Sequence, residues 1–234
     1  MILAAFDIDG TLTKTTWVDG ECYTRALKLE FGVTDINTTW SDYPHATDLG
    51  ITCEIFKQAF NRPPEKREIL KLIQRFMSLL RETHAADPQH FVEITGAAGI
   101  LQRLSSDSKL KVSIATGCWH KPAVFKLGCA KISTQGIPLS TSDQAFNRED
   151  IVLNSIAKAR DHYEVDQFSK IVSIGDSVWD VKTARTLGLP FIGVGDSAHL
   201  TDLGARDAVE DYRDQEGFIK LLEEAEIPDV RQRV

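Results

Sequence analysis

Residues 2–13, ILAAFDIDGTLT, join a run of apolar side chains to a short polar segment that holds Asp7, Asp9 and Gly10. An apolar run of this length, ended by acidic residues, is typical of a buried strand in a parallel sheet, because both faces of such a sheet are covered. Three other segments have the same form, an apolar run followed by small polar residues: 111–116, 170–176 and 190–196. The sequence therefore predicts four strands, each of which ends in polar residues.

Amphipathic helices are predicted between these strands, over residues 96–104, 118–127, 149–163 and 178–187. A further helix, a short strand near Ala208 and a helix over residues 215–225 are expected in the C-terminal part. The alternation of strands and helices implies a parallel sheet with helices on both faces. We therefore predict an α/β, Rossmann-like core domain formed by residues 1–13 and 93–234.

Residues 14–92 depart from this alternation, because no clear strand occurs among them. Apolar residues at helical spacing predict three helices there, around residues 26–31, 51–60 and 69–80. An insert of this kind, placed directly after the first strand, predicts a small α-helical cap domain beside the core.

The charge and the cysteine content restrict the classes of partner and the location. The chain of 234 residues carries 27 Lys and Arg against 34 Asp and Glu, a formal charge of −7, so we expect no nucleic-acid partner. No apolar run approaches the roughly 18 residues of a membrane span, so no membrane partner is expected. The four cysteines show no C-x-x-C spacing and the N-terminus lacks the basic start of a signal peptide, which predicts free thiols and a cytoplasmic location.

Polar side chains follow the predicted strands at one edge of the sheet, because the carboxyl ends of parallel strands meet there. Asp7 and Asp9 follow the first strand, Thr116 the second, and Asp176 with Asp180 the third. In extended chain Asp7 and Asp9 point to the same side, where their charges repel unless a cation or a shared proton lies between them. A group of carboxylates suits Mg²⁺, so the sequence predicts a magnesium site formed by these aspartates.

Three short motifs carry a family resemblance. Residues 7–13, DIDGTLT, resemble the D-x-D-G-T motif of the haloacid dehalogenase superfamily of phosphotransferases. Residues 114–117, IATG, are similar to its second motif, and residues 174–180, IGDSVWD, to its fourth, G-D-S-x-x-D. The resemblance covers about residues 1–13 and 93–225. The insert is similar, in position and helical character, to the cap of the subfamily that holds phosphoglycolate phosphatase and β-phosphoglucomutase.

The resemblance implies a chemistry for the aspartates. Asp7 is expected to attack the phosphorus atom and to form an aspartyl-phosphate. Asp9 is expected to protonate the leaving oxygen and then to take a proton from the water that hydrolyses this intermediate. Mg²⁺ is expected at the Asp7 carboxylate, the Asp9 backbone carbonyl, Asp176 and, directly or through water, Asp180.

The resemblance also implies a set of phosphate-binding groups. Phosphate oxygens are expected at the Thr116 hydroxyl and at nearby backbone N–H groups, including that of Gly117. The third motif of the superfamily supplies a basic residue, most often lysine, before the helix that leads to the next strand. Arg148 is our prediction for this residue, because it stands at a predicted helix start and its guanidinium matches phosphate geometry. Lys158 is the alternative, although it lies in the middle of that helix.

The predicted activity is Mg²⁺-dependent hydrolysis of a phosphomonoester, a small phosphorylated metabolite. The main alternative is a phosphomutase of the β-phosphoglucomutase kind, which uses the same residues and keeps water from the aspartyl-phosphate. A phospho-acceptor switch of the receiver kind is disfavoured, because its acceptor lies on a later strand and it has no helical insert. A dehalogenase is disfavoured by Asp9, since that chemistry has no acid two residues after the nucleophile.

Substrate specificity is expected to depend on the cap and on the loop after the second motif, where motifs give no guidance. The candidates for substrate contact there are Trp17, Tyr43, His45, Thr47, Asp48, Trp119 and His120. A packing or surface role is the more common one for a histidine or an aromatic residue in such a loop.

Overall fold

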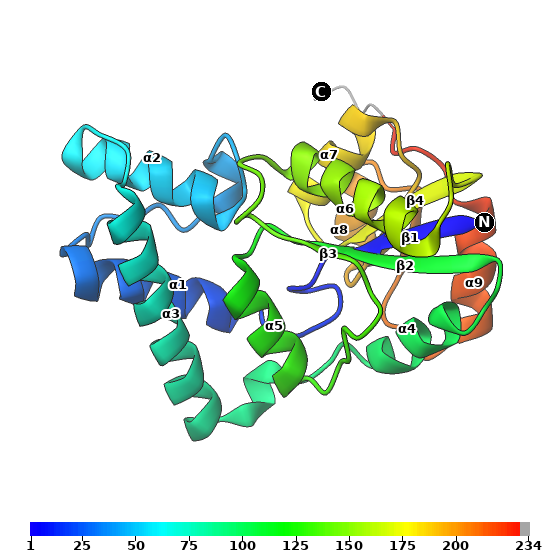
Figure 1. The fold of residues 1–234 in the computed structure, drawn as a ribbon, viewed down its shortest axis with the longest axis horizontal. Helices are drawn as coiled ribbons and strands as arrows, with labels where there is room; N and C mark the ends of the chain where they lie inside the picture. The colour runs from blue at the N-terminus through cyan, green and yellow to red at the C-terminus, as the bar shows by residue number, and fades with distance from the viewer. Residues whose placement is uncertain (230–234) are drawn as a thin grey trace.

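The computed structural model describes residues 1–229; residues 230–234, the end of the predicted core, lie outside the described residues. Its centre is a six-stranded parallel sheet in the order β3-β2-β1-β4-β5-β6 (Figure 1). The strands are β1 (Ile2–Phe6), β2 (Leu110–Ala115), β3 (Leu139–Ser140), β4 (Lys170–Gly175), β5 (Phe191–Val194) and β6 (Asp207–Val209). The predicted α/β core with a parallel sheet is therefore confirmed.

The central strand β1 fixes the edge at which the polar residues meet. Phe6, its last residue, pairs in register with Ile114 of β2 on one side and with Ile174 of β4 on the other. The chain continues the pairing one residue further, since the Asp7 N–H donates to the Ile174 carbonyl at 2.9 Å. The segments that follow β1, β2 and β4 consequently leave the sheet side by side.

Helices cover both faces of the sheet, as expected from the strand–helix alternation. One face packs through Phe6, Ile114 and Ile174 against α4 (Ala97–Ser105), α5 (His120–Cys129) and α9 (Gln215–Glu224). The opposite face, which carries Leu3 and Ala115, packs against α6 (Arg148–Tyr163). The neighbouring helices α7 (Val178–Leu187) and α8 (Ser197–Asp202) pack against Phe191 of β5.

The observed elements differ from the predicted ones at their ends and in one strand. The helix predicted from residue 118 begins only at His120, because the N–H of Trp119 is bonded to the Asp48 carboxylate at 2.8 Å and the chain there is extended. The short strand β3 was not predicted, since two residues give no measurable alternation. It is nevertheless positioned firmly, because the Thr116 N–H donates to the Ser140 carbonyl at 3.0 Å.

The insert after β1 consists of α1 (Thr16–Phe31), α2 (Asp48–Phe60) and α3 (Lys66–Ala86), with short 3₁₀ turns at Trp40–Asp42 and Pro88–Phe91. Figure 1 shows the three helices grouped at one end of the molecule, with α5 beside them and the sheet at the other end. Their buried side chains form a second hydrophobic cluster, which also takes in Trp119 from the core loop. The cap and the core are thus joined by packing.

The chain crosses between core and insert at two points that lie together. The Lys14 N–H donates to the Val92 carbonyl, and the Ile94 N–H donates to the Leu12 carbonyl, each at 2.9 Å. These backbone hydrogen bonds hold the base of the insert next to the segment that carries Asp7 and Asp9. Across residues 1–229, no helix combines the length and the apolar character that a membrane span requires.

Candidate active site

The carboxylates of Asp7, Asp176 and Asp180 form one group at the carboxyl edge of the sheet. One carboxylate oxygen from each of them lies within 4.8 Å of the other two. Gly10 makes this approach possible, because a Cβ atom built on it would lie 2.0 Å from Asp176 Oδ2. Gly10 also has a φ of +82°, a conformation that side-chain-bearing residues rarely adopt. Both observations explain why this position of the D-x-D-G-T segment requires glycine.

Arg148 joins this group from the first turn of α6. The helix begins there because the Asn147 side chain accepts a hydrogen bond from the Asp150 N–H at 2.7 Å. One guanidinium nitrogen, Nη2, donates to Asp7 Oδ1 at 3.1 Å and also to Asp180 Oδ1. Lys158, the other candidate, donates instead to the Leu139 carbonyl at 2.7 Å. Of the two basic residues, Arg148 is the one that reaches Asp7.

Burial makes these carboxylates hard to ionise. Desolvation raises the pKa of Asp7 to about 7; the Arg148 charge opposes the shift, and the charges of Asp180 and Asp9 add to it. Burial and the charges of Asp180 and Asp7 raise the pKa of Asp176 well above its ordinary range. No basic side chain in residues 1–229 forms an ion pair with Asp176, whose carboxylate accepts the Ser177 hydroxyl at 2.9 Å. The group thus holds three carboxylates, and the Arg148 charge pairs with only two of them, Asp7 and Asp180.

A divalent cation fits this set of donors. All of the side-chain donors are hard carboxylate oxygens, which are the ligands that Mg²⁺ prefers. Arg148 offsets part of the charge of Asp7 and Asp180 but does not touch Asp176. A cation bound among the three oxygens would therefore offset both the burial and the carboxylate repulsion that raise the pKa of Asp7 and of Asp176.

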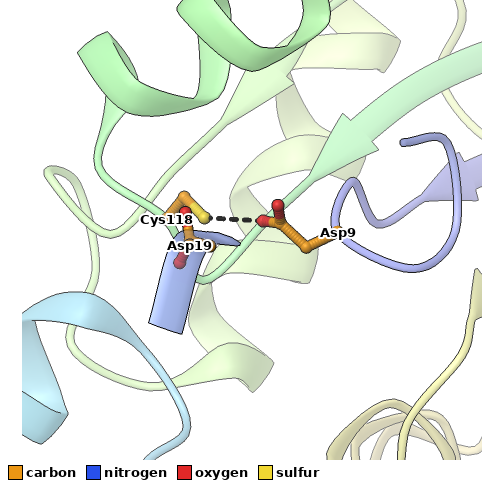
Figure 2. Close-up of side chains that lie close together, drawn as sticks. All are labelled: Asp9, Asp19 and Cys118. Carbon is orange, nitrogen blue, oxygen red and sulfur yellow. Dashed lines mark hydrogen bonds between the residues drawn. The ribbon is translucent and has the colours of Figure 1, made fainter. Parts of the chain in front are cut away.

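The Asp9 carboxylate belongs to a different group. Its Oδ2 accepts hydrogen bonds from the Lys126 ammonium at 2.6 Å and from the Cys118 thiol at 3.0 Å, and its Oδ1 accepts the Thr15 hydroxyl. Figure 2 shows Asp9 facing Cys118, with Asp19 of α1 beside them. Any contribution of Asp9 to a metal site next to Asp7 would consequently come from its backbone carbonyl.

Lys126 is the centre of this second group. Its side chain is completely buried, and its ammonium group also pairs with Asp19 and donates to Cys118 Sγ at 3.0 Å. Burial lowers the pKa of Lys126, but the charges of Asp19 and Asp9 outweigh this and raise it well above its ordinary value. The ammonium is therefore the cation around which the oxygen and sulfur atoms of Asp9, Asp19 and Cys118 are arranged.

Asp9 and Asp19 share this one cation unequally. Burial by itself would raise the pKa of Asp9, but the Lys126 charge and the hydrogen bonds from Cys118, Lys126 and Thr15 lower it below its ordinary value. Burial raises the pKa of Asp19 to about 6, because Lys126 opposes this only in part and the charge of Asp9 adds to it. In this arrangement Asp9 is ionised at neutral pH.

Thr116 and Gly117 lie in the loop after β2, against the same cavity as Asp7. The Thr116 hydroxyl accepts the Cys118 N–H at 3.2 Å, which fixes the turn of the loop. Gly117 allows a close approach of both Arg148 and the cap, because a Cβ atom there would lie 2.8 Å from Arg148 Nη1 and 2.7 Å from the Ala46 carbonyl oxygen. The loop contributes three small residues, Thr116, Gly117 and Cys118, to the cavity wall.

The cavity at Asp7 has one wall from the core and one from the cap. The core side consists of Asp9, Thr116, Gly117, Cys118, Arg148 and Trp179, and the cap side includes Asp19, Tyr23, Trp40, Thr47, Asp48 and Ile51. Of the candidates for substrate contact, Thr47 and Asp48 line this cavity. Tyr43 and His45 line a neighbouring hollow, and the Trp17 ring packs at a tilt against the His90 ring, with the centroids 4.8 Å apart.

The sequence did not predict Lys126 and Asp19 as site residues, nor the rings of Tyr23 and Trp40 in the cap wall. A signal for Lys126 exists, because it lies in the buried stripe of α5 between Ala123 and Leu127, where helical spacing favours an apolar residue. Asp19 likewise precedes the buried Cys22 and Tyr23 by about one turn of α1. A charged residue inside an apolar stripe indicates a buried partner, but the sequence does not say which one.

The sequence matches the haloacid dehalogenase-like hydrolase family over residues 4–194, most of the chain. The chain therefore belongs to this family. In the search of curated protein sequences, no match to this chain was found.

Solved structures share the fold at low sequence identity. A hydrolase from Pseudomonas syringae is 21% identical, with a TM-score of 0.71 over 94% of this chain and 98% of that one. A HAD hydrolase, family IA, variant 3, from Entamoeba histolytica is 18% identical, with a TM-score of 0.67 over 95% and 100%. A β-phosphoglucomutase from Clostridium difficile is 15% identical, with a TM-score of 0.66 over 96% and 98%.

Proposed function

We propose that this protein is a Mg²⁺-dependent phosphomonoester hydrolase that acts on a small phosphorylated metabolite. One observation carries the proposal: the Asp7 carboxylate lies at the carboxyl edge of the sheet, where it accepts a hydrogen bond from Arg148 and lies next to Asp176 and Asp180. A nucleophile in this position has a cationic side chain and a set of metal ligands around it, which is what attack on a phosphate dianion requires. Membership of the hydrolase family supports the same conclusion.

Mg²⁺ would be held by the Asp7 and Asp176 carboxylates and by the Asp9 backbone carbonyl, with Asp180 acting directly or through water. When bound, the ion supplies positive charge that offsets the repulsion between the nucleophile and the phosphate and stabilises the transition state. Arg148, the Thr116 hydroxyl and the backbone N–H of Gly117 would bind the phosphate oxygens.

Asp7 would attack the phosphorus atom in line with the ester bond. The bond between phosphorus and the leaving oxygen breaks, and the phosphoryl group is transferred to the Asp7 carboxylate. Asp9 would give a proton to the leaving oxygen and later take one from the attacking water. For this, Asp9 must leave Lys126, Cys118 and Thr15, which favour its ionised form, and take up a proton from solvent before it donates one to the leaving oxygen.

Phosphate release tests this proposal directly. The purified protein is expected to release inorganic phosphate from an aryl phosphate in the presence of Mg²⁺, and to stop when EDTA removes the ion. The release is measured colorimetrically, with excess Mg²⁺ added back as the control for EDTA. Hydrolysis that continues unchanged in EDTA would contradict the metal-dependent mechanism.

A phosphomutase remains the second candidate, because the β-phosphoglucomutase of Clostridium difficile has the same fold over nearly the whole chain. A mutase would return the phosphoryl group from Asp7 to a second hydroxyl of the substrate. It would release little phosphate and would need a bisphosphate activator. The phosphate assay with sugar phosphates, with and without such an activator, therefore separates the two activities.

Mg²⁺ affinity is expected to increase with pH. Asp7, whose pKa burial raises to about 7, must lose its proton before its carboxylate can hold the ion. A rise from about pH 5.5 to about pH 8 passes through this pKa, so the apparent Kd should tighten by roughly tenfold or more. Calorimetric titration of the metal-free protein at both pH values measures this. A Kd that stays constant would contradict the assignment of Asp7 as a ligand.

We also propose a cytoplasmic location, with a small phosphorylated metabolite as the partner and neither nucleic acid nor a membrane as a binding target. The free thiols of Cys22, Cys53, Cys118 and Cys129 agree with a reducing compartment.

A further inference from the structure

The wall of the cavity that faces Asp7 is built from the cap, and it is acidic and aromatic. Asp19 and Tyr23 come from α1, Trp40 from the turn after it, and Asp48 from the start of α2. If the phosphoryl group of a substrate lies at Asp7, its alcohol part extends toward this wall. The chemistry of these side chains therefore selects the alcohol.

Asp48 is a buried carboxylate without a cationic partner. Its residue is only 8% exposed, and its Oδ2 accepts the Trp119 N–H at 2.8 Å. No basic side chain of residues 1–229 forms an ion pair with it, since Lys126 is bonded to Asp9 and Asp19. Burial and the charge of Asp19 raise the pKa of Asp48 well above its usual range, and the charge of the nearby Lys126 opposes this only in part. A positive group in the cavity would remove this penalty.

Two aromatic rings stand on the same wall. Tyr23 and Trp40 meet edge to face, with ring centroids 6.0 Å apart, and both line the cavity. The Tyr23 ring is fixed by the hydrogen bond of its hydroxyl to the Thr52 hydroxyl at 2.7 Å. Aromatic rings next to a carboxylate attract organic cations, because the ring quadrupole and the carboxylate charge act in the same direction.

The net charge of the whole site also favours a positive group in the cavity. Six aspartates (residues 7, 9, 19, 48, 176 and 180) surround the cavity and the metal group, against the two cationic side chains of Lys126 and Arg148. With these aspartates ionised, a bound Mg²⁺ still leaves an excess of negative charge before a phosphate dianion enters. A substrate with a neutral alcohol part would increase that excess, whereas an ammonium group would reduce it.

We propose that the alcohol part of the substrate carries an ammonium group that binds against Asp48 beside the rings of Tyr23 and Trp40, so that the substrates are phosphate esters of amino alcohols. This inference rests on the proposed phosphomonoester hydrolase function. It names the class of ester that the cap wall recognises.

Two matched pairs of esters test the proposal. Phosphoethanolamine is compared with 2-hydroxyethyl phosphate, and phosphocholine with 3,3-dimethylbutyl phosphate, because each pair differs chiefly in the positive charge. We expect kcat/KM to be about tenfold or more higher for the cationic ester of at least one pair, the amount that a hydrogen bond or contact with a charged group contributes. This comparison uses the wild-type protein and depends on no variant.

The Asp48→Asn variant tests whether Asp48 causes the preference for the cationic ester. Asparagine keeps an oxygen that can accept the Trp119 N–H, so the loop retains its hydrogen bond. The kcat/KM ratio within the preferred pair should fall close to one. Asp35→Asn, at an exposed aspartate of the insert, makes the same charge change away from the cavity and should keep the wild-type ratio.

Three results would overturn the inference: a ratio near or below one for both pairs, a ratio that survives in Asp48→Asn, or hydrolysis of an aryl phosphate but of no member of either pair. In each of these cases the hydrolase function itself stands. Failure to release phosphate from any ester, the aryl phosphate included, would instead remove the proposed function and the inference together.

Discussion

The Asp7→Asn variant is expected to lose at least about 10⁴-fold in kcat for phosphate release, since removal of a covalent nucleophile costs this much or more in well-studied enzymes. The amide cannot form the acyl phosphate, because it lacks the negatively charged oxygen that attacks phosphorus. Asparagine has the same size, and its carbonyl oxygen can still accept the hydrogen bond that Arg148 donates to Asp7 at 3.1 Å. The loss is therefore expected without a change of fold.

Activity and folding must be measured on the same preparations of this variant. Phosphate release from an aryl phosphate gives kcat, and circular dichroism with thermal unfolding reports the fold. Asp166→Asn, at an exposed aspartate of the core, serves as the matched control and should keep wild-type activity. A rate for Asp7→Asn within about tenfold of the wild type would exclude Asp7 as the nucleophile.

The Lys126→Met variant is expected to lose about 3–5 kcal/mol of unfolding free energy, the range for removal of one partner from a buried ion pair. Methionine fills a similar volume but leaves Asp9 and Asp19 without the cation that both of them contact. Their negative charges would then stand in a buried site, where the Thr15 hydroxyl and the Cys118 thiol are the side-chain donors to Asp9 that remain among residues 1–229. Denaturant unfolding measures the change.

A second variant separates the ion pair from the packing of α5. Lys121→Met makes the same substitution at an exposed position of the same helix and should change the free energy of unfolding by less than about 0.5 kcal/mol. Adding Asp19→Asn to Lys126→Met removes one of the two unpaired charges and should restore part of the stability. A loss below about 1 kcal/mol for Lys126→Met would show that the buried pair has little net effect.

The position of the Asp7 group could be predicted from the sequence because it depends on local pattern and on a general rule of parallel sheets. The apolar runs before Asp7 and Asp176 predict strands, and parallel strands present their carboxyl ends at one edge. The structure brings the two carboxylates together there. The position of Arg148 could also be predicted from the sequence, because a helix start brings its side chain to that edge. Lys158 lies further along α6 and donates a hydrogen bond to the Leu139 carbonyl of β3.

Asp9 shows where the local pattern is insufficient. Extended chain places Asp7 and Asp9 on the same side, but the chain turns at Gly10 and the Asp9 carboxylate bonds to Lys126 and Cys118 instead. These partners lie more than one hundred residues away along the chain. The spacing of apolar residues around Asp9 or around Lys126 does not predict this pairing. Such spacing indicates which face of an element is buried, but not which residues contact that face.

By itself, then, the sequence determined the parallel sheet, the helical insert and the strand ends that carry Asp7, Asp176 and Asp180, since each of these follows from short-range patterns of apolar and polar residues. Only the tertiary structure decided that Lys126 neutralises Asp9 and Asp19, and that Asp48 faces the cavity without a cation. The physical reason is that charge compensation depends on distances across the interior, where desolvation makes each partner decisive.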